Sequence, residues 1–319
     1  AVGVLTNVSQ DHVDYHGDME SYLKAKARLF ESLGPGSTAV LNRDDPASHA
    51  MADQLETGVN VLWYGLSPEA DVRAEDIQPG PDGTRLRIVM PNGAVELFLP
   101  IVGSHNIENA LAAAATALAL GASELTVASA LEDARAVPGR LERVETPGAV
   151  IRGGRVRTFV DYAHTPDALD KVCSTLASVC DGDLHVVFGC GGDRDRGKRA
   201  PMAAAVARHA RFAYLTSDNP RSEDPLAIIA DMTGGFVGHA DDDGPVVGED
   251  RQSCDSFEVV DRAEAIRLAV SQARPGDTVL IAGKGHETYQ VFKDSVVPFD
   301  DRLEAGRALA AREAGWLHQ

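Results

Sequence analysis

The sequence predicts an α/β protein in which two domains are each built on a mainly parallel β-sheet. Short apolar segments typical of buried strands alternate with helical segments along most of the 319 residues, and this alternation indicates repeated β-α-β units. Two runs of alternating polarity joined by Pro-Asn-Gly predict one small antiparallel hairpin, over residues 84–100. A Pro-Gly pair at 138–139 then interrupts the pattern, so we expect domains at 1–137 and 138–319.

The remaining expected elements follow in chain order. The first domain is expected to have strands at 1–8, 37–45 and 59–66 and helices at 21–30, 105–121 and 122–134. In the second domain, strands are expected at 157–163, 183–190, 212–218, 256–261 and 277–283, and helices at 166–179, 201–210, 225–232 and 263–273. This steady alternation predicts a doubly wound α/β domain.

Composition excludes several classes of protein. The 48 acidic residues outnumber the 30 basic ones and give a net charge of −18, so we expect no nucleic-acid partner. No apolar run has transmembrane length and no signal peptide is evident, so we expect a cytoplasmic protein without membrane insertion. The cysteines at 173, 180, 190 and 254 have no zinc spacing, as expected of free thiols in a reducing compartment. The chain starts inside an apolar strand without Met, and we expect a fragment that lacks its N-terminal part.

Five polar loops follow expected strands. In doubly wound sheets, ligands bind at the carboxyl ends of the strands. Each of these loops combines His, Asp, Arg or Lys with glycine or proline, and together they predict one binding site. The loops are residues 9–17, 161–167, 189–199, 216–225 and 282–290.

The loop at 189–199 nearly matches a phosphate-binding P-loop. Residues 192–199 read G-x-x-x-x-G-K-R, so Arg199 stands where a P-loop has the Ser or Thr that holds Mg²⁺. We interpret the segment as a glycine-rich loop that offers basic side chains to anionic groups; a basic loop without a ligand is the alternative. These side chains are Arg194, Arg196, Lys198 and Arg199.

The loop at 216–225 contains Asp-Asn-Pro-Arg at 218–221. Asp218 and Asn219 can hold an ammonium group, while Arg221 can form a forked pair with a carboxylate. A ligand that satisfies both is a zwitterion such as an amino acid. Taken alone, the segment is better explained as a turn that caps the helix beginning at Pro225.

Lys26 lies within the apolar stripe of the helix expected over 21–30. Burial penalises a charged ammonium, and a neutral amine can react with CO₂ to form a carbamate, which is a suitable ligand for Mg²⁺. His12, just upstream, can supply a second ligand. A lysine that extends past the stripe to solvent is the simpler interpretation from the residues alone. The stripe consists of Tyr22, Leu29, Phe30 and Leu33.

Together these segments resemble the Mur ligases, and within that family the MurE branch. The resemblance is carried by TNVSQDHVDYHGDMESYLKAKARLF, HNIENALAAAA, GRLER, VDYAHTPDAL, FGCGGDRDRGKR, DNPRSEDP and GKGHETYQ, in that order. It implies that 1–137 is part of a central ATP-binding domain, without its P-loop and the preceding N-terminal domain. It also implies that 138–319 is a Rossmann-like domain that binds an amino acid. The fragment alone is then expected to be inactive.

The resemblance also implies a reaction. ATP would phosphorylate the D-glutamate carboxylate of UDP-N-acetylmuramoyl-L-alanyl-D-glutamate, and the amine of meso-diaminopimelate would attack the acyl phosphate. The partners are then these three small molecules with Mg²⁺, in peptidoglycan precursor synthesis, and a monomer is expected.

Family roles can be placed on individual residues through the matching motifs. Lys26 matches a carbamylated, Mg²⁺-binding lysine and His12 a metal-ligand histidine. The positions implied to bind ATP are His105, Asn106, Asn109, Arg140 and Asp161. Those implied to bind diaminopimelate are Arg194, Asp218, Asn219, Arg221, Gly283 and Glu287. No role follows for His164 or Lys284.

Several alternatives stay open at this point. A MurE that adds L-lysine differs at the position of Arg221, because lysine has no second carboxylate for a guanidinium to bind. Folylpolyglutamate synthetase shares the ATP chemistry but lacks the Asp-Asn-Pro-Arg loop. A non-catalytic amino-acid-binding protein needs only the second domain. A dinucleotide oxidoreductase is disfavoured because no G-x-G-x-x-G follows a strand.

Overall fold

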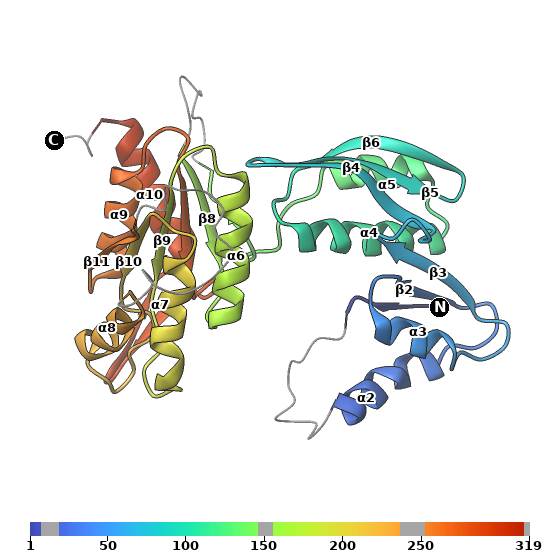
Figure 1. The fold of residues 1–319 in the computed structure, drawn as a ribbon, viewed down its shortest axis with the longest axis horizontal. Helices are drawn as coiled ribbons and strands as arrows, with labels where there is room; N and C mark the ends of the chain where they lie inside the picture. The colour runs from blue at the N-terminus through green and yellow to red at the C-terminus, as the bar shows by residue number, and fades with distance from the viewer. Residues whose placement is uncertain (8–18, 146–155, 237–252, 316–319) are drawn as a thin grey trace. The chain divides into compact units, whose positions relative to one another are not determined.

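The computed structural model describes residues 1–7, 19–145, 156–236 and 253–315, and it divides into two compact units. Unit 1 is Ala1–Arg135 and unit 2 is Ala136–Gln319. Each unit has helices packed on its own central β-sheet (Figure 1). Within the described ranges, no helix combines the length and apolar character needed to cross a membrane.

The sheet of unit 1 is parallel at one end and antiparallel at the other. Its order is β1-β2-β3-β4-β5-β6, and pairing is parallel from β1 to β4 and antiparallel from β4 to β6. The strands are β1 Val2–Leu5, β2 Thr38–Asn42, β3 Asn60–Gly65, β4 Val72–Gly80, β5 Gly83–Met90 and β6 Gly93–Leu99.

The expected hairpin is confirmed, because β5 and β6 pair up to Met90 opposite Gly93 across the Pro-Asn turn. β4 was not expected; its charged residues and Pro79 hid the strand pattern. The hairpin therefore belongs to a three-stranded antiparallel extension of the main sheet.

Helices cover both faces of the parallel part of this sheet. α4 is rich in alanine, and buried residues such as Leu111 and Ala115 share a core with Val40 of β2. On the other face, Phe30 and Met51 pack against Leu41. The helices are α2 Met19–Glu31, α3 Pro46–Ala52, α4 Ser104–Ala119 and α5 Glu124–Glu132.

Unit 2 has a doubly wound sheet, as predicted. Its order is β11-β10-β9-β12-β8-β7, and every neighbouring pair is parallel except β7 with β8. β12 lies between β8 and β9, so the chain reverses its direction of winding there, which is where ligands bind in such folds. The strands are β7 Glu142–Arg143, β8 Arg157–Asp161, β9 Leu184–Phe188, β10 Phe212–Leu215, β11 Asp255–Glu258 and β12 Thr278–Ala282.

The helices of unit 2 form layers on the two faces of the sheet (Figure 1). α9 and α10 share a core with Val187 and Val279, whereas α6 and α7 pack together on the opposite face. Asp and Thr side chains cap the first turns of α6, α8, α9 and α10 by accepting backbone N–H groups, which explains where these helices begin. The helices are α6 Pro166–Val179, α7 Arg199–Ala207, α8 Pro225–Thr233, α9 Arg262–Gln272 and α10 Asp301–Glu313, with short 3₁₀ turns η1 Arg196–Lys198 and η2 Gly234–Phe236.

Two features of unit 2 were missing from the expectation. The segment after β12 forms an antiparallel hairpin of β13 Tyr289–Phe292 and β14 Ser295–Pro298, and α10 follows it. The exposed residues of β14 follow no period-two pattern, so its sequence has no strand signal.

Candidate functional site

The structure brings together four of the five expected loops at the carboxyl edge of the unit 2 sheet. The backbone N–H of Gly192 donates to Asn219 O at 2.9 Å, and that of Gly283 donates to Asp161 O at 3.1 Å. A third contact connects the loops at 282–290 and 216–225, because the Lys284 ammonium donates to Asp218. The fifth loop, residues 9–17, lies outside the described residues, and so does His12.

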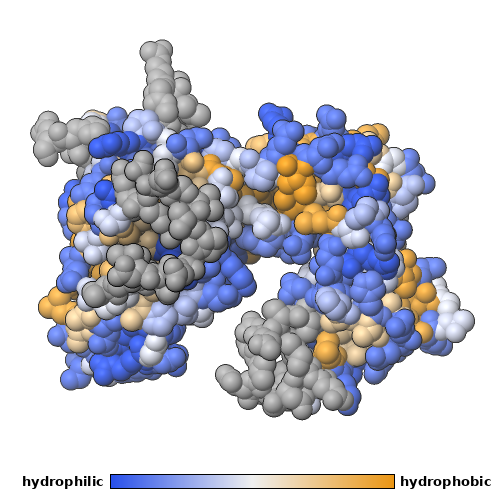
Figure 2. Space-filling model, in the orientation of Figure 1, coloured by the Kyte–Doolittle hydropathy of each residue, from blue (hydrophilic) through white to orange (hydrophobic). Residues whose placement is uncertain are grey.

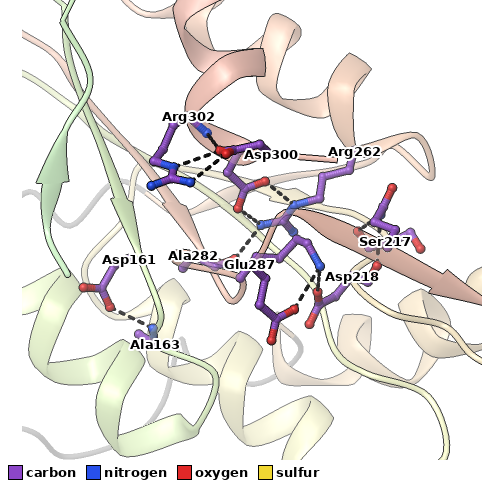
Figure 3. A network of polar contacts seen from close by, with 12 residues as sticks. Asp161, Ala163, Ser217, Asp218, Arg262, Ala282, Glu287, Asp300 and Arg302 are labelled. Carbon is purple, nitrogen blue, oxygen red and sulfur yellow. Dashed lines mark hydrogen bonds and ion pairs between the residues drawn. The ribbon is translucent and has the colours of Figure 1, made fainter. Parts of the chain in front are cut away.

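A buried polar cluster lies where these loops meet. The Lys284 ammonium donates to Asp218 Oδ1 at 3.3 Å, Asn219 Oδ1 at 3.2 Å and Glu287 Oε2 at 3.2 Å. The carboxylates of Asp218 and Glu287 point toward one another (Figure 3). Lys284, Asp218 and Asn219 are all buried, whereas Glu287 is half-buried at the edge of the cluster. Three of the residues expected to bind diaminopimelate are therefore neighbours.

Arg221 stands beside this cluster in an unusual backbone conformation. Its φ is 52°, in the left-handed region that non-glycine residues rarely adopt. Two contacts hold it there: its N–H donates to Val291 O of β13 at 3.0 Å, and its guanidinium donates to Gly192 O at 2.8 Å. β13, which the sequence did not reveal, therefore fixes the conformation of the Asp-Asn-Pro-Arg turn.

The interpretation of the glycine-rich loop as a set of available cations is wrong for Arg199. This side chain is buried, forms a forked pair with Glu223 at 3.1 and 2.8 Å, and also donates to Asp231 at 2.8 Å. Arg196 contacts the same two carboxylates, and Lys198 donates to His164 O. Arg199 begins α7, so it points back under the loop rather than toward a ligand.

Arg194, by contrast, is exposed at the tip of the loop, one residue after the left-handed Asp193. It is the residue of this loop that the motif match placed at the amino-acid site, and its position leaves it accessible.

Glu223, which follows the Asp-Asn-Pro-Arg turn, forms hydrogen bonds with the glycine-rich loop. Besides Arg199, it accepts the N–H of Asp193 at 2.7 Å. The hydrogen bond from Arg199, followed by that from Asp193, lowers the pKa of Glu223 to about 2. Gly192 lets the two loops touch, because a Cβ there would lie 1.9 Å from Pro220 O. The glycine thus serves close packing between loops.

Asp161 and Arg140, both expected at the ATP site, lie close together in unit 2. Asp161 accepts the backbone N–H groups of Leu141 at 2.8 Å and Ala163 at 2.7 Å, and these contacts fix its side chain at the end of β8. Arg140 is exposed, with its guanidinium 4.8 Å from the centre of the Tyr162 ring. Tyr162 also stacks with His286, with ring centres 5.6 Å apart.

His105, Asn106 and Asn109, the other residues expected at the ATP site, lie at the start of α4 in unit 1. Asn106 Nδ2 donates to Val102 O at 2.8 Å, and Asn109 Nδ2 donates to Asn106 Oδ1 at 3.3 Å. His105 and Asn109 are exposed.

The position of Lys26 differs from the expectation. The structure places it half-buried on α2, and Leu29, expected in the buried stripe, is 52% exposed. The residues of this helix that pack into the core include Leu23 and Phe30, which are seven residues apart. At 100° per residue, Lys26 lies about 60° from Leu23 and Leu29 about 120°. Lys26 therefore lies at the edge of the buried face.

The structure also shows residues that the sequence did not single out. Arg262 and Asp301 form a fully buried pair, with two hydrogen bonds of 2.7 Å, and Arg262 lies near the cluster (Figure 3). Arg262 also donates to Ala282 O at 2.9 Å and so anchors the end of β12. Because 39 residues separate the partners, no local pattern could have predicted this pair. No role for Lys284 followed from the sequence, and the feature that could have pointed to one is its position between two glycines.

The described residues do not by themselves form a metal site. Across the ranges that the structure describes, no group of three or more His, Cys, Asp or Glu side chains is placed to hold a metal ion. Any metal bound here would need ligands from outside these ranges or a modified side chain.

The fold and the site define a class. Residues 1–117 match the Mur ligase middle domain, and residues 139–285 match the glutamate ligase domain of Mur ligases. The chain belongs to the Mur ligase family, and the resemblance expected from its motifs is confirmed.

Two of its relatives carry the name of one branch of this family. The chain is 44% identical over 317 residues to the UDP-N-acetylmuramoyl-L-alanyl-D-glutamate–2,6-diaminopimelate ligase of Geobacillus thermodenitrificans, a match that covers 98% of this chain and 60% of the relative. A solved structure of an enzyme of that name has a TM-score of 0.70 at 38% identity, covering 98% of this chain and 60% of that one. The MurF ligase of Thermotoga maritima in complex with ADP has a TM-score of 0.60 at 15% identity, covers 99% of this chain and 62% of that one, and shows the shared fold. The chain thus spans 60% of the length of the first two relatives.

Proposed function

We propose that the protein to which this chain belongs is an ATP-dependent ligase that joins meso-diaminopimelate to UDP-N-acetylmuramoyl-L-alanyl-D-glutamate. The observation that carries the proposal is the polar cluster of unit 2, where the carboxylates of Asp218 and Glu287 lie near Arg221. A zwitterionic amino acid complements this arrangement of charges. The names of the relatives supply the identity of both substrates.

In this proposal, unit 2 binds and orients the amino acid. Asp218 and Glu287 accept hydrogen bonds from an ammonium group, and Asn219 and Gly283 complete the wall of the pocket. Arg221 and Arg194 bind a carboxylate of the ligand, for which a guanidinium offers parallel N–H groups. Diaminopimelate has a second amino-acid end, so one end can be held while the amine of the other reacts.

The reaction proceeds in two steps in this scheme. The γ-phosphoryl group of ATP moves to the D-glutamate carboxylate and leaves ADP. The neutral amine of diaminopimelate then attacks the acyl carbon, an amide bond forms, and phosphate leaves with the electron pair of the broken C–O bond. Positioning of the three reactants supplies much of the rate in reactions of this type.

Each unit by itself contains residues that are proposed to contact the nucleotide. In unit 2, Asp161, whose side chain is fixed by two backbone N–H groups, is proposed to bind the ribose, and Arg140, which lies over Tyr162, is proposed to contact the nucleotide. His105, Asn106 and Asn109 of α4 are proposed to lie near the adenine. Residues 1–137 are accordingly proposed as part of the central ATP-binding domain and 138–319 as the amino-acid-binding domain.

Mg²⁺ belongs to the same proposal, with Lys26 as a carbamate and His12 as its ligands in this chain. The metal would neutralise charge on the transferred phosphoryl group. The residues that the structure describes do not by themselves form its site. The proposal further includes a monomeric, cytoplasmic protein.

The test uses the full-length protein with ATP, Mg²⁺ and UDP-N-acetylmuramoyl-L-alanyl-D-glutamate, and measures phosphate release after adding meso-diaminopimelate or L-lysine. We expect release with diaminopimelate alone. Release with lysine instead would retain the ligase and reject the role of Arg221. No release with either would reject the ligase in favour of a non-catalytic amino-acid-binding protein.

Arg221→Ala sharpens the test. It is expected to reduce the preference for diaminopimelate over lysine more than it changes the KM for ATP. Arg307→Ala removes an exposed guanidinium on α10 and serves as the matched control. Unchanged discrimination in the Arg221 variant would contradict the assignment.

A further inference from the structure

Lys284 is the most completely buried ammonium group described in the chain. Its side chain has 0% exposure, and its three acceptors, on Asp218, Asn219 and Glu287, lie at 3.2–3.3 Å. An ammonium group has three N–H donors, so these contacts use all of its hydrogen-bonding capacity. The side chain is therefore engaged entirely by protein groups and has no donor left for a ligand.

The backbone around Lys284 is built to direct this side chain inward. Gly283 has a φ of 116° and Gly285 a φ of 54°, values that L side chains rarely adopt. A Cβ at Gly285 would lie 2.8 Å from Gly139 O. The N–H of Glu287 donates back to Lys284 O at 3.0 Å, and this turn brings the Glu287 carboxylate over the ammonium.

Lys284 orients the groups that face the ligand. It donates to the Oδ1 atom of Asn219, which also accepts the N–H of Val291 at 2.9 Å. Because the amide oxygen is used in this way, the amide Nδ2 of Asn219 faces Glu287 and donates to its Oε2 at 3.1 Å. One oxygen of Asp218 and one of Glu287 are fixed on the same ammonium. Within the described part of the chain, the second oxygen of each carboxylate accepts no hydrogen bond, and it remains for a ligand.

The charges of the cluster also indicate that it can bind an ammonium group. Asp218 and Glu287 point toward one another (Figure 3), and two carboxylates at close range repel unless a cation lies between them. Lys284 is that cation, and Arg262 is matched by Asp301 behind it. The ionised groups of the cluster then have one negative charge in excess, which is the charge that a single ammonium group neutralises.

We propose that Lys284 is the positioning residue of the amino-acid pocket: through Asp218, Asn219 and Glu287 it fixes the acceptors that bind the ammonium group of diaminopimelate. The inference rests on the proposed function and adds a residue that acts without touching the substrate. It separates Lys284 from Arg221, whose guanidinium is proposed to contact the ligand directly.

The experiment compares Lys284→Met, Lys284→Arg and Lys293→Met in the full-length protein. Lys293 is exposed in the turn between β13 and β14, so its variant makes the same chemical change outside the pocket. The KM values for diaminopimelate and for ATP are measured separately, together with kcat. We expect Lys284→Met to raise the KM for diaminopimelate at least about tenfold while the KM for ATP changes less than about twofold.

Lys284→Arg retains the positive charge, but a planar guanidinium cannot direct its N–H groups at the three acceptors as an ammonium group does. We therefore expect a smaller rise in the KM for diaminopimelate. If Lys284→Met does not fold, the Arg variant decides by the same comparison of the two KM values. Equal changes in both KM values, or no change in either, would overturn the proposal. Failure of the unmodified enzyme to release phosphate with diaminopimelate would instead refute the proposed function, so the two failures are distinguishable.

Discussion

Removal of the Asp301 carboxylate is the sharpest test of what holds the site in place. Arg262 and Asp301 are both 0% exposed, and the guanidinium donates to both carboxylate oxygens at 2.7 Å. Asp301→Asn keeps the shape of the side chain but removes its charge. Arg262 would then remain buried with neutral acceptors only, which are the amide oxygen of the new side chain and the Ala282 carbonyl, and with no charge to compensate its own.

The expected cost follows from this burial. Breaking a buried ion pair by removing one partner costs about 3–5 kcal/mol, because the remaining charge is left uncompensated. For a domain of this size, each kcal/mol lowers the Tm by about 2–4 °C. We therefore expect Asp301→Asn to lower the Tm of unit 2 by roughly 10 °C. The double variant Arg262→Met with Asp301→Leu removes both charges and should restore most of the loss.

The assays are thermal and denaturant unfolding together with native-state hydrogen exchange, which is read at the amides of β12 because Arg262 anchors the end of that strand. Asp167→Asn is the control, since it breaks the pair between Lys171 and Asp167, whose side chains are 75% and 80% exposed. We expect that control to cost less than about 1 kcal/mol. A similar small loss for Asp301→Asn, or a double variant less stable than the single one, would refute the reasoning.

Three further predictions test the loops and the backbone. Arg199 and Asp193 hold the pKa of Glu223 at about 2, below its usual 4.5, so its contribution to stability is present above about pH 4.5 and is lost as the pH falls toward 2. The urea midpoint of the natural protein should therefore fall more between pH 5 and pH 3 than that of Glu223→Gln; parallel curves would contradict the linkage. Gly192→Ala should destabilise unit 2 by about 1–3 kcal/mol, because its Cβ would lie 1.9 Å from Pro220 O, and equal unfolding midpoints would show that the loops separate without cost. Gly306→Ala, in α10 with no atom within 4 Å of the added Cβ, should stabilise the helix by about 0.5–1 kcal/mol in the same assay, and a loss there would refute the helix-entropy argument.

The layered α/β fold and the gathering of polar loops at the carboxyl edge of the unit 2 sheet were predictable because the signals are local. Strand and helix patterns, the Pro-Asn-Gly turn and the motif loops each occupy a short segment, and parallel strands bring their carboxyl ends to one edge of a sheet. Asp218 and Glu287 could be named from sequence because both lie in such loops. β4, β7, β13, β14 and α10 were not predicted, and the charged residues of β4 illustrate how a strand can lack an apolar pattern.

The partners of the charged residues depended on contacts between distant segments. From the sequence, Arg199 was interpreted as an available cation, but in the structure it is paired with Glu223. In the same way, α2 exposes Leu29, which was expected to be buried, and buries Phe30. Lys284 meets Asp218 across 66 residues, and Arg262 meets Asp301 across 39. The sequence by itself thus determined which loops follow the strands of unit 2 and gather at the carboxyl edge of its sheet. Only the tertiary structure decided which charges neutralise one another and which remain for a ligand, because electrostatic energy depends on distance and burial rather than on order along the chain.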